Sequence, residues 1–274
     1  MIDSLTVGGI DMLRGPWDME RVTGWFDTPG VRLETVDRLG HGAHTSNGRW
    51  ANRLVRITGL FHHDDCVDQQ AERDRLAGLF HDGETVEVRM VHGGLDLAND
   101  FRLADELKVE PDTDTLSDFD MLLAAVDPFL YAPERVTFLH PVGTGIGLEY
   151  PLFHRDLGKG QVLTFGTGIA ANDPIRNAGN AEAWPVFLVV GDFPGGFEIT
   201  VAGRTITWPW PTTKARPVEV RMDGSIFEAG SNMTHRATRR DWVSIPPGGV
   251  IAPEFSGLQG GEGWCEVHHR DTFI

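Results

Sequence analysis

Residues 50–91, WANRLVRITGLFHHDDCVDQQAERDRLAGLFHDGETVEVRMV, contain three segments with different hydrophobic periods. In residues 50–61 the side chains alternate, with Val55 and Ile57 on one face and Arg56 and Thr58 on the other, which predicts a strand. Residues 84–91 alternate in the same way. Between them, residues 67–80 carry an apolar stripe at helical spacing, formed by Val67, Ala71, Leu76, Leu79 and Phe80. We therefore expect a strand, a helix and a second strand in this order.

The flanking segments predict further short strands. Gly8-Gly9 lies between alternating flanks and signals a two-residue hairpin within residues 3–13. Residues 119–126 predict a buried strand that ends at Asp127-Pro128, because proline cannot donate to a sheet ladder. Other expected elements are a loop or arm over 14–30 anchored by Trp17 and Trp25, a strand over 31–36, a polar connection over 40–48, a strand or short helix over 101–110 and a loop over 111–118.

The character of the chain changes after about residue 135. No convincing helix follows, and Gly or Pro interrupts every gap between short alternating segments, a pattern typical of a β-sandwich or jelly roll. Ala202-Gly203 joins two of these segments as a tight hairpin. We predict a mainly β chain of two domains: residues 1–135, with the one helix, and residues 136–274, a sandwich.

The formal net charge of −16 is unevenly distributed. Residues 1–135 hold 26 acidic and 13 basic side chains, whereas residues 136–274 hold 14 acidic and 11 basic ones. The excess is densest in residues 96–127, with ten acidic groups against Arg102 and Lys108. Such a surface repels phosphate, so wrapping of nucleic acid through phosphate contacts is excluded. Taken alone, this segment predicts a solvated loop that keeps the protein soluble.

Composition excludes several classes of protein. The two cysteines, Cys66 and Cys265, are too few for a disulfide scaffold or a Cys-rich zinc fold. The first ten residues lack the basic and apolar regions of a signal peptide, so we expect no export signal. The longest apolar runs are far shorter than a membrane span, so we expect none.

No catalytic motif is present, and we predict neither an enzyme nor a cofactor. Metal-ligating residue types do occur in two clusters, residues 62–66 (HHDDC) and residues 265–269 (CEVHH). Adjacent histidines in a strand point to opposite faces, so each pair offers at most one inward ligand. We prefer the interpretation of a helix-entry loop and a terminal edge strand with exposed histidines, and predict no metal.

Tryptophans are the remaining candidate ligand-binding residues of the second half. Trp208, Trp210, Trp242 and Trp264 could stack on sugars if they are exposed. The favoured interpretation is that they fill the sandwich core and its interfaces. Both interpretations remain open from the sequence alone.

Several ordered features together resemble the distal tail (Dit) proteins of long, non-contractile-tailed bacteriophages (siphophages), in particular those of phages that infect high-GC actinobacteria. The strand–helix–strand order of residues 50–91 is the first. Residues 121–131 (MLLAAVDPFLY) form an apolar strand followed by Asp-Pro and an aromatic residue. Residues 177–187 (NAGNAEAWPVF) resemble the family's Asn-x-Gly-Asn…Pro pattern before its C-terminal sandwich. Residues 242–248 (WVSIPPG) and a last strand, 264–270, complete the order. Residues 14–48 match no pattern of the family.

The resemblance implies a structural, non-enzymatic protein of the tail tip or baseplate hub. It implies a tail-tube-like β domain at residues 1–135 and a galectin-like sandwich at residues 136–274. Six copies would form a ring that joins the tail tube protein to the tip proteins, and DNA would pass through its lumen without specific binding. The protein would be made in the host cytoplasm and located in the virion, at the tail tip.

The resemblance also yields candidate site residues. We expect part of the acidic segment to face the lumen or its rim, where negative charge suppresses adhesion of DNA; the residues are Asp100, Asp105, Glu106, Glu110, Asp112, Asp114 and Asp118. The motif residues with an expected structural role are Asp127, Pro128, Asn177, Gly179, Asn180 and Pro185. Candidate glycan-binding or interface aromatics are Trp208, Trp210 and Trp264.

Two other functions compete with this prediction. A carbohydrate-binding or receptor-binding protein built on the sandwich would lose sugar binding on Trp208→Ala or Trp264→Ala. A wall-degrading hydrolase would release product from peptidoglycan, although the sequence locates no carboxylate pair for it.

Overall fold

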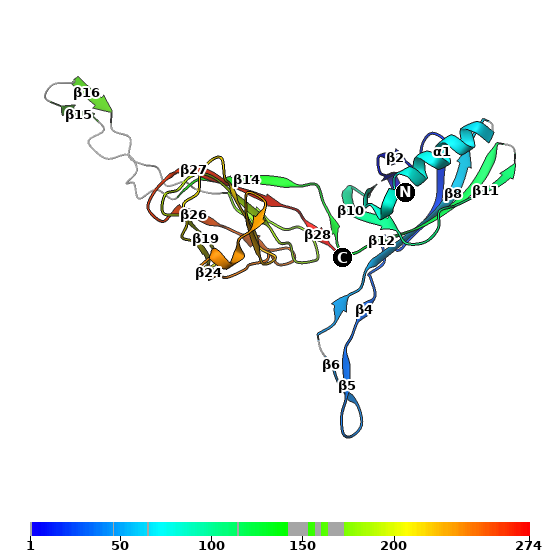
Figure 1. The fold of residues 1–274 in the computed structure, drawn as a ribbon, viewed down its shortest axis with the longest axis horizontal. Helices are drawn as coiled ribbons and strands as arrows, with labels where there is room; N and C mark the ends of the chain where they lie inside the picture. Colours follow the sequence, from blue (N-terminus) through cyan, green and yellow to red (C-terminus); the bar gives the residue numbers. More distant parts are fainter. Residues whose placement is uncertain are drawn as a thin grey trace. The chain divides into compact units, whose positions relative to one another are not determined.

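The computed structural model of the chain describes residues 2–45, 47–64, 66–113, 115–141, 153–156, 160–163 and 173–274. The chain forms two compact units (Figure 1). Unit 1 comprises Met1–Pro133 together with Phe273–Ile274, and unit 2 comprises Glu134–Thr272. The return of the last two residues to unit 1 is not indicated by the sequence. The predicted mainly β fold class is confirmed.

Unit 1 is built on one ten-stranded antiparallel sheet with the helix α1 (Cys66–Gly78) across it (Figure 1). Seven strands follow the order β2-β1-β9-β10-β12-β8-β3; β11 pairs with β12, and β13 pairs with β10 and β28. The strands are β1 (Ile2–Val7), β2 (Ile10–Asp11), β3 (Trp17–Thr23), β8 (Arg53–His62), β9 (Val86–His92), β10 (Leu95–Leu103), β11 (Lys108–Thr113), β12 (Leu116–Ala125), β13 (Leu130–Tyr131) and β28 (Thr272–Phe273).

The alternation seen in the sequence determines which side chains enter the core of unit 1. In β8 the odd-numbered positions are buried, including Val55 and Ile57, and Arg56 is exposed. Helix α1 contributes Leu76, and Phe80 just beyond its end is also buried. Ala71, expected on the same stripe, is exposed. Among the helix residues whose side chains the structure describes, burial is therefore confined to the C-terminal half; the side chain of Val67 lies outside the described part.

The two predicted aromatic anchors are buried in unit 1. Trp17 stacks on Phe61 at a ring distance of 4.5 Å, and Trp25 stacks on Phe101 at 6.1 Å. Trp17 does not lie in a loop, because residues 17–23 form the strand β3 beside β8. Alternate side chains at the start of this segment are apolar and pack into the core, so the segment joins the sheet although glycines and prolines surround it.

One expectation for the acidic segment was wrong. Residues 111–118 are not a loop, because β11 runs to Thr113 and β12 begins at Leu116, so that the two strands form a hairpin. Of the strand or short helix expected over residues 101–110, the structure contains strand at both ends, because β10 ends at Leu103 and β11 begins at Lys108. Strand β11 pairs with β12 along its length, and this pairing outweighs the preference of the local residues for a turn.

Residues 28–52 form an arm of two short antiparallel ribbons that projects from the sheet of unit 1 (Figure 1). The strands are β4 (Val31–Arg32), β5 (Thr35–Asp37), β6 (Ala43–Thr45) and β7 (Arg49–Trp50). β4 pairs with β7 and β5 with β6. The sequence predicted the strand at 31–36 but not its pairing with the polar connection that follows.

The base of the arm is held by Arg53, whose side chain is 1% exposed. Its Nη1 donates to the carbonyl oxygens of Gly24, Trp25 and Asp27, at 3.1, 3.0 and 2.8 Å. Its Nε donates to the carbonyl of Pro128 at 2.8 Å. One guanidinium therefore joins the segment that leads into the arm to the segment that follows β12.

Unit 2 is a sandwich with a six-stranded sheet, β14-β27-β18-β21-β22-β23, and a four-stranded sheet, β24-β20-β19-β26. β17 and β25 form a separate pair, as do β15 and β16. The strands are β14 (Arg135–Leu139), β15 (Phe153–Asp156), β16 (Gly160–Leu163), β17 (Ile175–Arg176), β18 (Val186–Asp192), β19 (Phe197–Val201), β20 (Arg204–Trp208), β21 (Val218–Arg221), β22 (Ser225–Glu228), β23 (Ser231–Asn232), β24 (Arg239–Arg240), β25 (Val250–Ile251), β26 (Glu254–Gly257) and β27 (Glu262–His269).

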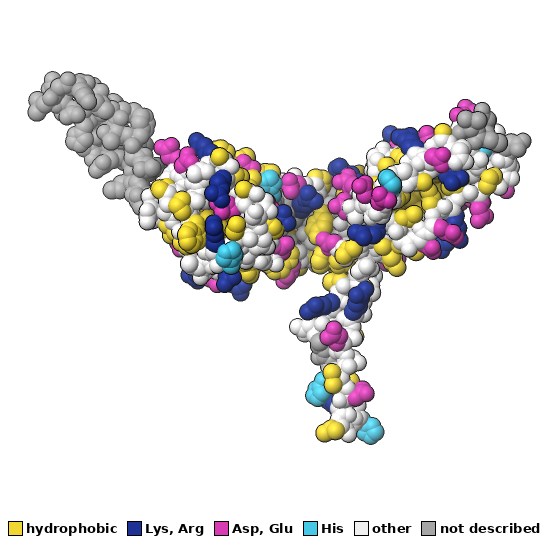
Figure 2. Space-filling view, viewed as in Figure 1, with side chains coloured by type: hydrophobic (Ala, Val, Ile, Leu, Met, Phe, Trp, Pro, Cys, Tyr) yellow, Lys and Arg dark blue, Asp and Glu magenta, His cyan; other side chains and the backbone are white. Residues whose placement is uncertain are grey.

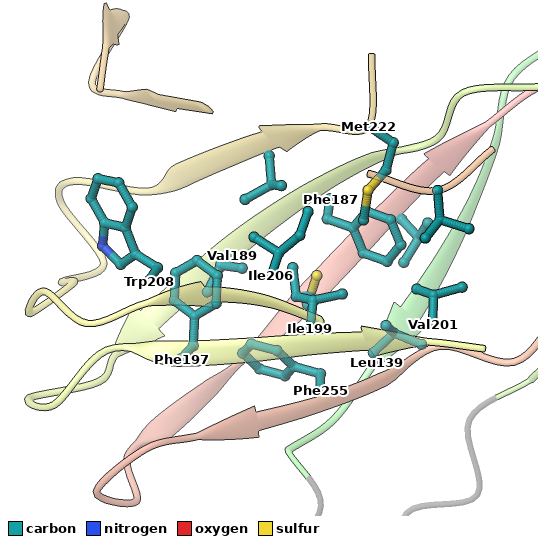
Figure 3. Close-up of a cluster of buried hydrophobic side chains, with 14 of the residues drawn as sticks. Leu139, Phe187, Val189, Phe197, Ile199, Val201, Ile206, Trp208, Met222 and Phe255 are labelled. Carbon is teal, nitrogen blue, oxygen red and sulfur yellow. The ribbon is translucent and has the colours of Figure 1, made fainter. Parts of the chain in front are cut away.

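The inner faces of the two sheets form the core of unit 2 (Figure 3). Phe187 and Val189 enter from the six-stranded sheet, and Phe197, Ile199 and Trp208 enter from the four-stranded one. Alternate residues along each strand supply this core, as the sequence pattern predicts. In the described part of unit 2 the helical structure is a single 3-10 turn, and no described helix of the chain is long and apolar enough to cross a membrane.

Asn177 connects several backbone segments at the edge of this core. Its buried Nδ2 donates to the carbonyls of Ala181 at 2.7 Å and Ile245 at 3.2 Å. Its Oδ1 accepts from the backbone N–H groups of Gly179 at 3.0 Å and Thr272 at 3.2 Å. These four backbone groups are not paired with one another in a sheet. The Asn177 amide therefore supplies hydrogen bonds that buried backbone groups require.

Replacing Arg53 by Met should lower the free energy of unfolding by about 2–4 kcal/mol, because it leaves buried carbonyl groups without a donor. Chemical denaturation of purified protein measures this change. Arg21→Met, which removes an exposed arginine from the neighbouring strand β3, should change the value by less than about 0.5 kcal/mol. Equal effects of the two substitutions would contradict the role assigned to Arg53.

Asn177→Ala should also destabilise the protein by about 2–4 kcal/mol, because it removes donor and acceptor from buried backbone groups. Gly179→Ala should be at least as damaging, since an added Cβ would lie 1.9 Å from the carbonyl oxygen of Thr272. Thermal unfolding followed by circular dichroism measures both effects. Gln259→Ala, an exposed amide of the same unit, is the control and should leave the unfolding temperature unchanged.

Candidate assembly surface

The arm of residues 28–52 exposes apolar side chains that its own chain does not cover. Every residue from Val31 to His44, and from Asn47 to Trp50, is exposed. The large apolar ones are Val31, Leu33, Val36, Leu39 and Trp50. A two-stranded ribbon without a packed face is marginally stable in water, and exposed apolar clusters mark interaction sites. The arm is therefore the strongest candidate for a protein-binding surface in unit 1.

The charge of the arm differs from that of the unit that carries it. Residues 31–50 contain Arg32, Arg38 and Arg49 against Glu34 and Asp37, while residues 1–135 as a whole carry twice as many acidic as basic groups. Figure 2 shows basic, histidine and apolar side chains interspersed along the arm. The arm is weakly basic and apolar, so its charge is complementary to the acidic surface of unit 1 in another copy of the chain.

Arg53 fixes where the arm leaves the sheet. Burial lowers the pKa of its guanidinium, and the nearby Asp27 carboxylate partly opposes this shift. The sequence analysis missed this residue, although a signal was present. Arg53 has the same parity in the alternating segment as Val55 and Ile57, so its side chain was bound to point into the core with them.

Asp127 and Pro128 lie just after β12, in the second segment that the Arg53 side chain contacts. The Asp127 carboxylate accepts from the Phe129 N–H at 3.1 Å and from the Tyr131 hydroxyl at 2.5 Å. The Asn99 amide donates to the carbonyls of Asp127 and Phe129 at 2.8 and 2.7 Å. The motif thus holds the chain in a tight turn after β12, next to the Pro128 carbonyl that Arg53 binds.

The acidic residues assigned to a lumen occupy the outer face and turns of β10, β11 and β12. Six of the seven are exposed, namely Asp100, Asp105, Glu106, Glu110, Asp112 and Asp118, while Asp114 lies outside the described residues. Glu110 lies directly opposite Asp118 in the β11–β12 pair, and Asp100 lies opposite Glu87 in the β9–β10 pair. Directly opposed like charges destabilise a sheet, so the fold itself does not explain them.

The same face also carries basic groups, so it is not uniformly acidic. Asp120 forms a two-pronged ion pair with Arg56, which lowers the pKa of the Asp120 carboxyl group. Lys108 lies opposite Asp120 in the β11–β12 register. The unneutralised negative charge therefore lies towards the Glu110–Asp118 end of this hairpin.

The two clusters of metal-ligating residues lie in different units. Within the described residues, no group of three or more His, Cys, Asp or Glu side chains is arranged to hold a metal ion. His63 is buried and its Nε2 lies 3.1 Å from the Ser117 hydroxyl. This contact joins the segment that precedes α1 to strand β12. Asp65 lies outside the described residues. Cys265 points into the sandwich core, and burial raises the pKa of its thiol.

The candidate aromatics of unit 2 have three different environments. Trp208 is fully buried in the core, so its assignment as a glycan-binding residue was wrong. Trp264 is partly buried and its Nε1 donates to the Glu266 carboxylate at 2.8 Å. Trp210 is 48% exposed. Trp208 lies in β20 with the inward parity of Ile206, whereas Trp210 lies beyond the end of this strand.

The remaining motif residues lie around the start of the sandwich. Asn177, Gly179 and Pro185 are buried, and Asn180 is exposed. The Pro185 carbonyl accepts from the Met222 N–H at 3.1 Å, which fixes the approach to β18.

No family model and no curated protein sequence matches the chain. Solved structures do match it along its whole length. The Dit (gp 19.1) protein of phage SPP1, described as a paradigm of the hub adsorption apparatus of phages that infect Gram-positive bacteria, is similar with a TM-score of 0.65. The identity is 13%, and the match covers 99% of each chain.

A chain of the phage P2 baseplate in its activated conformation with Ca is also similar, with a TM-score of 0.52 and 9% identity over 97% of each chain. The structure with Sr gives the same values. These likenesses confirm the fold that the resemblance in the sequence predicted. The chain therefore has, over nearly its full length, the fold of a Dit hub protein of the phage tail.

Proposed function

We propose that the chain is a structural protein of a phage tail tip, and that copies of it assemble into a ring between the tail tube and the tip proteins. The observation that carries this proposal is the match to a hub protein over 99% of both chains. A match of this extent involves both units and the connection between them in sequence, and not one widespread domain fold.

Self-assembly would use the arm of residues 28–52. Its apolar side chains have no cover within the described residues of its own chain, and its basic residues complement an acidic unit such as unit 1. A contact of one surface with a different surface of the next copy is heterologous, and such contacts generate rings when the rotation closes. Six copies, the number that the family resemblance implies, is the number we propose.

In such a ring, residues 1–135 would build the wall and residues 136–274 would lie outside it. The acidic residues on β10–β12 would face the lumen or its rim, so that DNA passes without adhering. The like-charge pairs on this face support the proposal, because they oppose folding stability and are unexplained without a function. A side-chain-resolution structure of the ring with these residues on the outer surface would reject this part.

The proposed partners are other copies of the chain, the tail tube protein and a tip protein, and the proposed location is the tail tip of the virion. We do not propose a wall-degrading enzyme, because the similar solved structures are a hub protein and a baseplate protein.

The arm predicts a specific effect on assembly. Val36→Asp should abolish self-association, because it introduces a charge into the apolar surface that a neighbouring copy covers. Sedimentation velocity at micromolar concentration measures the fraction of assembled protein. Val250→Asp is the matched control, since Val36 is 69% exposed and Val250 57%, but Val250 lies in unit 2. Unchanged assembly of the Val36→Asp protein would contradict the role of the arm.

The acidic hairpin predicts opposite effects of two similar substitutions. Asp118→Asn should raise the unfolding temperature, because it removes the repulsion from Glu110. Asp120→Asn should lower it, because it removes the partner of Arg56. Differential scanning calorimetry near neutral pH measures both. If Asp118→Asn lowers the unfolding temperature, negative charge at this position serves the fold, and the argument for a lumen role is lost.

A further inference from the structure

A basic edge borders the four-stranded sheet of unit 2. Strand β24 is the end of this sheet and pairs with β20 alone, through Ile206 opposite Arg240 and Thr207 opposite Arg239. Both arginines are exposed. Figure 2 shows Lys and Arg side chains gathered on the visible face of unit 2, in the region where Figure 1 labels β24.

Each end of this edge carries a tryptophan that interacts with an arginine. At one end the Trp210 Nε1 donates to the Arg236 carbonyl at 3.1 Å, and the Arg236 guanidinium carbon lies 5.4 Å from the indole centre. At the other end the Arg204 guanidinium donates to the Trp242 carbonyl at 3.3 Å. Residues 204 to 210 span about 20 Å when extended, so the edge is long enough for several sugar units.

The cations on this edge outnumber the carboxylates that lie beside them. Arg216 and Arg236 share the single carboxylate of Glu228, and Arg239 pairs with Asp241. Among the described residues, no side-chain hydrogen bond or ion pair engages Arg240 or Lys214. Four carboxylates lie beside these cations: Glu228, Asp241, Asp192 at the Lys214 N–H, and Glu198 at the Thr207 hydroxyl. The cations outnumber them, in a chain whose net charge is −16; they are Arg204, Lys214, Arg216, Arg236, Arg239 and Arg240.

Trp210 provides a fixed apolar surface within this positive field. Its ring is 48% exposed, although the Nε1 hydrogen bond and the Arg236 guanidinium hold it in place. A tryptophan fixed in this way loses little conformational freedom when a ligand stacks on it. The C–H face of a sugar ring stacks on such a surface, and neighbouring arginines bind the carboxylate or phosphate groups of an acidic sugar polymer.

We infer that the β20–β24 edge of unit 2 is a binding site for an anionic glycan, with Trp210 as the stacking platform. Arg239 and Arg240 point to opposite faces of this edge strand and would bind the anionic groups of the ligand from its two sides. Nucleic acid also combines phosphate with flat rings. The acidic surface of the rest of the chain repels a long polynucleotide, however, and a glycan with more widely spaced charges experiences less of that repulsion. The inference does not require ring assembly, because the edge lies within unit 2.

The test measures binding of the full-length protein by isothermal titration calorimetry at about 50 mM and about 200 mM salt. The probes are oligogalacturonate, which supplies carboxylates, a glucosylated poly(glycerol phosphate), which supplies phosphates, and dextran of matched length as the neutral comparison. At least one anionic probe should bind at least about tenfold more tightly than dextran, with affinity falling as salt rises. The first two probes distinguish a carboxylate from a phosphate ligand.

Two variants locate the site. Arg239→Gln/Arg240→Gln and Trp210→Ala should each weaken binding about tenfold, with unchanged circular dichroism spectra. Arg176→Gln/Arg221→Gln removes the same charge from exposed positions elsewhere in unit 2, and Trp184→Ala removes an indole of matched exposure, 46% against 48%. Both controls should retain the affinity of the unchanged protein.

Three results would overturn the inference. They are absence of binding to both anionic probes, equal losses in the variants and their controls, and binding of single-stranded DNA as tight as that of the better glycan at the same salt concentration. Loss of glycan binding with intact self-association, or the reverse, separates this site from the proposed assembly role of the arm.

Discussion

The structure of unit 1 depends on one buried cation. Arg53 donates to three carbonyls at the base of the arm and to the Pro128 carbonyl beyond β12. Burying a guanidinium is costly unless its donors find acceptors, and carbonyl oxygens serve Nε and Nη1 here without an opposing buried carboxylate, while Nη2 has no partner among the described residues. Because the arm has no core of its own, its base has to be fixed by such contacts if it is to present a constant surface to a partner.

The same principle operates in unit 2 with an uncharged side chain. The amide of Asn177 binds backbone groups of three segments at the border of the sandwich core: residues 179–181, Ile245 and Thr272. Both residues lie where sheet ladders stop and buried backbone still requires partners. The two surfaces proposed for binding lie elsewhere, on the arm of unit 1 and on the β20–β24 edge of unit 2.

Local patterns in the sequence predicted much of this fold, and long-range contacts account for what they missed. The hairpin turns at Gly8-Gly9 and Ala202-Gly203 depend on adjacent residues, and the structure contains both. The acidic hairpin and the arm depend on which strand lies opposite, which composition does not encode. Trp208 is buried, which agrees with the core interpretation favoured for the tryptophans, and the burial of Arg53 could have been recognised from its parity with Val55 and Ile57.

Assembly is the central property proposed for the chain, and the mass of the purified protein tests it most directly. Native mass spectrometry at micromolar concentration should give a discrete species at six times the 30.2 kDa mass of the chain. A closed ring requires one defined stoichiometry, so intermediate species should be minor. A monomer at every concentration, or an open series of masses without an end point, would contradict the account.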